Sequence, residues 1–178
     1  ATGERHAAPF LVLGDPTPDL TVELAVAAVS AGASMLELGM PFSDPSADGP
    51  AIQAAIGRAR AAGVSTDEAL AVLARIHEAV PGVPLNLLVY GNLVHARGLS
   101  RFAELAAAAG ASSLLVPDLP LGEDAELAAA CMAADLGHVH LVAPSTDPAR
   151  LAALDRAATG FLYLAAYQGV TGASEASG

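Results

Sequence analysis

Short apolar runs alternate with longer segments of helical character along the whole chain. Six runs rich in leucine, valine and other large apolar residues have the length of buried strands, at residues 9–13, 34–38, 85–89, 113–116, 138–142 and 161–164. Five segments between them predict helices, at residues 19–30, 65–80, 100–109, 122–134 and 148–157. This alternation predicts parallel strands joined by helical crossovers.

Signals at the helix ends support this interpretation. Ser65 and Glu68 stand three residues apart, as the two partners of a capping box do, and they predict the start of the second helix. Asp147 followed by Pro148 is typical of a helix start, and Gly110 is typical of a helix stop.

Two α/β architectures fit the alternation, an open doubly wound sheet and a (β/α)8 TIM barrel. The glycine-rich turn that favours the open sheet is absent after the first strand, where Gly14, Asp15 and Pro16 stand instead. We therefore expect one TIM-barrel domain over residues 1–178, covering roughly the first six βα units, because a full barrel takes about 250 residues. The start at Ala1, without Met, favours a partial sequence of a longer protein; a remnant lacking the last units is the alternative.

Composition excludes several classes of protein. Hydrophobic residues make up 53% and charged residues 15%, which excludes an intrinsically disordered chain. The net charge of −11 argues against nucleic acid or an anionic membrane as a partner, and no apolar stretch is long enough to span a bilayer. One cysteine, Cys131, predicts a reducing cytoplasm. All eight basic residues are arginine, so these 178 residues offer no lysine for a Schiff base.

The candidate chemistry lies in and after the second strand. Alternation places Glu37 opposite the face shared by Leu36 and Leu38, inside the expected barrel, where an unpaired carboxylate is costly. A long loop with three prolines follows, and it contains Asp48, eleven residues after Glu37. Two carboxylates in different environments can divide acid and base roles. Each acid also has a simpler explanation, a hydrogen-bonded buried acid for Glu37 and turn formation for Asp48.

The motif over residues 36–50, Leu-Glu-Leu-Gly-Met-Pro-Phe-Ser-Asp-Pro-Ser-Ala-Asp-Gly-Pro, resembles that of the tryptophan synthase alpha subunit family. Weaker matches follow in order at residues 10–16, 87–92, 116–120, 163–164 and 169–172. The resemblance implies a TIM barrel that cleaves indole-3-glycerol phosphate to indole and glyceraldehyde 3-phosphate by a retro-aldol reaction. It makes Glu37 the acid/base residue and Asp48 the carboxylate that faces the indole nitrogen.

The resemblance also implies a substrate pocket and a partner. Residues expected to bind the substrate are Phe10, Leu88, Leu115, Tyr163, Thr171 and Gly172. A synthase beta subunit, in an alpha2-beta2 heterotetramer, would carry pyridoxal phosphate, while this chain would need no cofactor. Contact with that subunit is expected at Asp44, Pro45 and Pro120. Ala166 and Tyr167 replace the Ser-Arg that the family usually has in its sixth loop, which bears on loop closure.

A second hypothesis remains open, a non-catalytic barrel module that binds a beta-type partner. The five histidines point to no metal site in the sequence. His6, His77 and His95 are expected near helices or loops in solvent. His138 and His140 share one face of their strand, but at its beginning, away from the expected active face.

Overall fold

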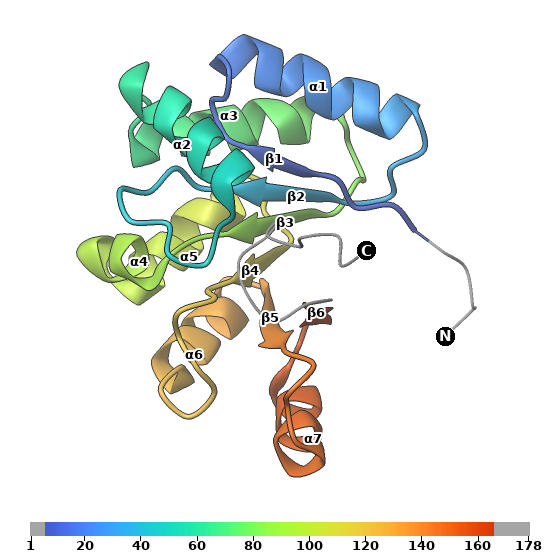
Figure 1. Cartoon of the computed structure of the whole chain (residues 1–178), viewed down its shortest axis with the longest axis vertical. Helices are drawn as coiled ribbons and strands as arrows, with labels where there is room; N and C mark the ends of the chain where they lie inside the picture. The colour runs from blue at the N-terminus through green and yellow to red at the C-terminus, as the bar shows by residue number, and fades with distance from the viewer. Residues whose placement is uncertain (1–5, 166–178) are drawn as a thin grey trace, which may run out of the picture.

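The computed structural model describes residues 6–165, in which a curved, all-parallel sheet alternates with helices (Figure 1). Its strands run in chain order, each paired with the next: β1 (Phe10–Val12), β2 (Leu36–Gly39), β3 (Leu85–Leu88), β4 (Ser113–Leu115), β5 (Gly137–Val142) and β6 (Leu162–Leu164). All six lie within the predicted runs to within a residue. A doubly wound sheet reverses its strand order part way, whereas a TIM barrel keeps chain order throughout. The observed order is that of the barrel.

The helices connect successive strands. They are α1 (Pro18–Ser30), α2 (Pro50–Ala61), α3 (Thr66–Ala79), α4 (Gly91–Arg97), α5 (Leu99–Ala108), α6 (Ala125–Ala133) and α7 (Pro148–Ala157). The capping box of Ser65 and Glu68 forms as predicted, with both of its hydrogen bonds present. Asp147 caps α7 by accepting a hydrogen bond from the N–H of Arg150. None of the helices in residues 6–165 is both long and apolar enough to cross a membrane.

Helices α2 and α4 were not predicted. Neither has a side chain that caps its first turn, so the strongest sequence signal for a helix start is missing from both. Helix α2 also contains Gly57, and α4 has only seven residues. The prediction of five helices was therefore incomplete.

The two faces of the sheet differ in what covers them. Leu36, Leu38, Leu85, Leu87 and Leu114 point outward and are fully buried in a core shared with the helices. Helix α1 packs beside α3, and α5 beside α6, to close this core. The opposite, inner face carries Glu37, Asn86 and Ser113, and the alternation around Glu37 predicted its place there.

Pairing between strands defines a row across the inner face. Phe10 of β1 is in register with Glu37, which is in register with Asn86 of β3 and, beyond it, Ser113 of β4. Gly39 belongs to the same face, two residues after Glu37. Its lack of a side chain makes room for the Phe10 ring, since a Cβ there would lie 2.5 Å from the ring's Cζ.

Candidate active site

Glu37 lies on the inner face of β2 and is only 7% exposed. Burial raises the pKa of its carboxyl group above the ordinary value, because a charge away from water is penalised. A hydrogen bond with the Tyr163 side chain opposes part of this rise. Glu37 is thus a buried acid whose proton is held more tightly than that of a solvated glutamate, which suits a group that gives and takes protons.

Asp48 lies in the loop between β2 and α2 and is 6% exposed. The loop folds on itself: the Asp48 N–H donates to the Pro45 carbonyl (3.1 Å), and the side chain of Gln53 in α2 donates to the Asp48 carbonyl (2.8 Å). These bonds turn the Asp48 carboxylate inward. Burial raises its pKa as well, and a hydrogen bond from Tyr90 partly offsets the rise.

Tyr90, which follows β3, holds the Asp48 carboxylate and the loop together. Its hydroxyl donates to Asp48 Oδ2 (2.7 Å) and accepts from the Ala47 N–H (3.1 Å). Its ring is buried and stacks on Phe42, with centroids 5.0 Å apart. Burial and the bond to Asp48 both raise the pKa of Tyr90, so its hydroxyl stays a donor. Tyr90 therefore contacts both the loop backbone at Ala47 and the carboxylate of Asp48.

Tyr163 of β6 lies close enough to both carboxylates to be affected by their charges. Its pKa is raised by burial and then by the negative charges of both Glu37 and Asp48. The Tyr163 hydroxyl of β6 therefore lies near Glu37 of β2 and near Asp48 in the loop that follows β2. The structure therefore brings Glu37, Asp48 and Tyr163 together.

The predicted apolar residues line the same face. Leu88 is in register with Gly39, and Leu115 is in register with Leu88, so both side chains share the face of Glu37. Phe10 is opposite Glu37 itself, and it is half-buried, as Leu88 is. Three apolar side chains beside two carboxylates form a floor suited to a flat aromatic ligand with a polar edge.

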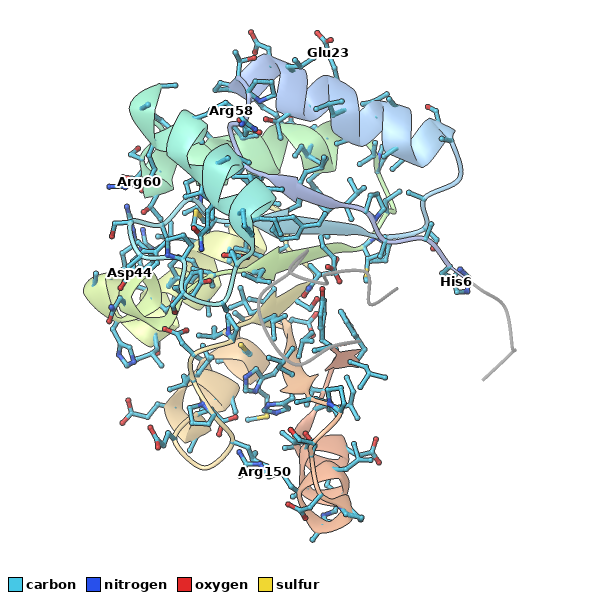
Figure 2. All side chains as sticks on the ribbon, in the orientation of Figure 1. His6, Glu23, Asp44, Arg58, Arg60 and Arg150 are labelled. Atoms are coloured by element: carbon cyan, nitrogen blue, oxygen red, sulfur yellow. The ribbon has the colours of Figure 1, made fainter. Side chains whose placement is uncertain are left out.

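The remaining predicted residues lie elsewhere. Asp44 and Pro120 are exposed and Pro45 is half-buried, and Figure 2 shows Asp44 at the outer edge of the β2–α2 loop. Asp118 accepts a hydrogen bond from the Gly91 N–H (2.8 Å) at the start of α4, which is a capping role. Ala166, Tyr167, Thr171 and Gly172 lie outside the described residues.

Sequence reasoning missed Asn86. It is 1% exposed, in register with Glu37, and its side-chain oxygen accepts a hydrogen bond from the Ser113 hydroxyl (2.7 Å). Its Nδ2 has no hydrogen-bond partner among the described residues, so a donor stands in the row of Glu37. The available signal was an amide between Leu85 and Leu87, in a strand otherwise built of leucine.

His138 and His140 lie on the outer face of β5, opposite to Val139, which is in register with Leu115. Both rings are buried, which lowers the pKa of each imidazole. Asp124, at the start of α6, faces both of them. Cys131 is buried in α6, and burial raises the pKa of its thiol to about 11.

Sequential parallel strands with two buried carboxylates at the second strand and its loop define a TIM barrel with an acid-lined mouth, the architecture of many enzymes. The family model "Tryptophan synthase alpha chain" matches residues 1–178. The chain belongs to the tryptophan synthase alpha chain family, as the loop motif predicted.

Individual relatives agree with this assignment. The tryptophan synthase alpha chain of Laribacter hongkongensis is 45% identical, and the match covers 98% of this chain and 66% of that relative. The tryptophan synthase alpha chain of Corynebacterium glutamicum is 39% identical, and the match covers 98% of this chain and 62% of that relative. A tryptophan synthase structure from Mycobacterium tuberculosis superposes with a TM-score of 0.88 at 38% identity, covering 96% of this chain and 66% of that chain. This chain thus spans 62–66% of the length of these relatives, and the predicted barrel fold, in its first six units, is confirmed.

Replacing Tyr90 by Phe is expected to lower kcat/KM of a reaction at the Glu37–Asp48 site about tenfold, because the Asp48 carboxylate loses the donor that orients it. The same hydrogen bond lowers the pKa of Asp48, so its loss should move the acidic limb of the pH–rate profile to higher pH. Steady-state kinetics between pH 5 and 8 would measure both effects. A tenfold loss with an unmoved acidic limb would show that Tyr90 supports only the fold.

Proposed function

We propose that the protein cleaves indole-3-glycerol phosphate to indole and glyceraldehyde 3-phosphate, the alpha reaction of tryptophan synthase. The observation that carries the proposal is the pair of buried acids, Glu37 and Asp48, whose charges both raise the pKa of Tyr163. Membership of the family supports the same reaction.

The reaction needs a proton delivered to ring carbon C3, a proton removed from the side-chain hydroxyl, and stabilisation of the positive charge that develops at the indole nitrogen. The bond between ring carbon C3 and the side chain breaks only after C3 is protonated, because the ring then leaves as neutral indole with the bonding electron pair. The neighbouring hydroxyl loses its proton and becomes the aldehyde, so the proton count balances. Glu37 delivers the proton to C3 and accepts the one from the hydroxyl. Asp48 accepts a hydrogen bond from the indole N–H and stabilises the cation that forms there.

The non-catalytic module is the weaker hypothesis. A buried ionisable carboxylate costs free energy unless it is paired with a cation or performs chemistry. Glu37 and Asp48 are both buried, and neither forms an ion pair with a cation among the described residues. A surface-binding module gains nothing from keeping two such groups inside the barrel, whereas a proton-transferring enzyme does.

A tryptophan synthase beta subunit is the proposed partner, in an alpha2-beta2 assembly. The exposure of Asp44 and Pro120 supports a contact through the β2–α2 loop and the loop before α6. Pyridoxal phosphate would belong to that partner, and the alpha reaction described above uses no cofactor. A cytoplasmic location is part of this proposal, since the one cysteine of the sequence, Cys131, is buried and free.

The direct test is indole release from indole-3-glycerol phosphate by the full-length protein, with and without a purified beta subunit. We expect slow release alone and a higher rate with the partner. If the partner binds but no indole forms under either condition, the protein is a binding module instead.

A further inference from the structure

A buried cluster on the outer face of β5 gathers three potential metal ligands. His138 and His140 project from β5, and Asp124 lies at the start of α6 above them. Asp124 Oδ2 lies 4.0 Å from His138 Nε2 and 3.7 Å from His140 Nδ1, and all three ligand atoms lie within 4.8 Å of one another. The three side chains are each more than nine-tenths buried.

Asp124 Oδ2 is too far from either ring nitrogen to form a hydrogen bond with it. Asp124 does not cap α6; its Oδ1 accepts from the Gly122 N–H (2.9 Å), which leaves Oδ2 directed at the two rings. On the opposite sides of the rings, His138 Nδ1 and His140 Nε2 are also buried without a hydrogen bond. Buried polar groups in native proteins are nearly always paired, so two neighbouring buried imidazoles that each carry an unpaired nitrogen form an unusual cluster.

The spacing fits a small cation. Two ligands bound at about 2.1 Å to one tetrahedral ion lie roughly 3.4 Å apart, so the distances from Asp124 need to close by only a few tenths of an ångström. Two imidazoles and one carboxylate are a donor set that zinc and neighbouring transition metals prefer, whereas calcium and magnesium prefer oxygen alone. Binding would use Asp124 Oδ2, His138 Nε2 and His140 Nδ1 at once.

The surroundings leave access for the ion and room for a fourth ligand. A cavity of about 240 Å³ borders His140 and is lined also by Leu119, Thr146 and Arg150. Figure 2 shows Arg150 reaching from α7 toward the loop that precedes α6. A water molecule in this cavity could complete a four-coordinate site.

We propose that Asp124, His138 and His140 form a binding site for a divalent transition-metal ion of the zinc class. The site joins the start of α6 to β5 on the helix-covered side of the sheet. Because His138 and His140 point away from the face of Glu37 and Asp48, the ion would hold the barrel wall together and take no part in the proposed cleavage.

The test is zinc binding by full-length protein without an affinity tag, measured by competition with a coloured chelator. We expect one site with a Kd of about 1 μM or tighter, and no comparable site for Mg²⁺ or Ca²⁺. At a hundredfold excess of Zn²⁺ over Kd, the Tm should rise by roughly 5–10 °C. Cobalt in place of zinc should give the visible absorption bands of a four-coordinate ion.

Two variants and a matched control identify the ligands. His140→Phe and Asp124→Asn should each weaken zinc binding at least about a hundredfold and abolish the rise in Tm, since even losing a group that only orients a ligand costs ten- to a hundredfold. His95→Phe makes the same change at an exposed histidine of α4 and should bind zinc as the unaltered protein does.

Thermal melts without metal show whether each variant folds, and Asp124→Asn, which preserves shape, serves if His140→Phe does not. Absence of zinc binding by the unaltered protein, or unchanged affinity in both variants, would overturn the proposal. So would a cluster that only takes up protons, which would appear as a pH-dependent Tm without any response to zinc.

Discussion

Replacing Glu37 by Gln is expected to slow indole release by roughly 10³-fold, the middle of the range for removing a general acid–base group. Gln keeps the size of the side chain and can still accept the Tyr163 hydrogen bond, but it cannot deliver a proton to ring carbon C3 or take one from the substrate hydroxyl. Single-turnover measurements with a fixed excess of enzyme would give the rate of the chemical step. KM should change little, since the apolar floor of the cavity is unaltered.

The loss of activity should come without a loss of stability. Burial raises the folded-state pKa of Glu37, so the folded protein holds this proton more tightly than the unfolded chain. That stabilising contribution is present at pH below the unfolded-state pKa and is lost as pH rises through the folded-state pKa. At a pH above the folded-state pKa, the ionised Glu37 is therefore a cost that Gln removes, and in that pH range Glu37→Gln should melt at the same or a higher temperature.

Glu23 offers a matched control, because it makes the same substitution possible on the exposed outer side of α1 (Figure 2). Glu23→Gln should release indole at the unaltered rate. If Glu37→Gln retained more than a tenth of the activity, Glu37 would not be the proton donor.

The second large effect is expected for Asp48→Asn, which should lower kcat/KM by about 10²- to 10³-fold. The loss equals the typical effect of removing one group that stabilises charge in a transition state. Asn keeps an oxygen that can accept from the Tyr90 hydroxyl, so the loop conformation should survive while the negative charge facing the indole nitrogen is lost. The effect should fall mainly on kcat, because the positive charge at nitrogen develops only during the reaction.

Asp155→Asn on the exposed surface of α7 is the corresponding control and should behave as the unaltered protein does. Combining Asp48→Asn with Tyr90→Phe makes a double-mutant cycle. The second substitution should have much less effect once the charge is gone, since the two residues act through one hydrogen bond. Fully additive losses would contradict this coupling.

Strand positions were predictable because the pattern around them is strong. Runs such as Leu85–Leu88 are mostly leucine and buried on both faces, as strands covered by helices and by a barrel interior must be. The lack of a capping side chain removes one local signal of a helix start from α2 and α4, and α4 is also only seven residues long. Tertiary contacts, such as the pair of hydrogen bonds between Arg58 of α2 and Asp15, leave no local pattern to recognise.

The candidate site was predictable only in part, for a similar reason. Alternation within β2 placed Glu37 inward without further information. Tyr90, however, is 42 residues from Asp48, and only the folded loop shows that its hydroxyl is the partner of that carboxylate. The zinc-site proposal depends on Asp124, which precedes the two histidines by a loop and a helix. Two histidines alone are a weak signal, and the third ligand becomes visible only in three dimensions.

The close approach of the Phe10 ring to Gly39 has a consequence for how the cavity can evolve. The Phe10 ring occupies the space that a side chain at position 39 on the neighbouring strand would need. The side chains at positions 10 and 39 therefore cannot both be large. Adding a methyl group at 39 is tolerable only if the aromatic ring opposite is exchanged for something smaller. A larger residue at position 39 could therefore become fixed only after a smaller residue had replaced Phe10.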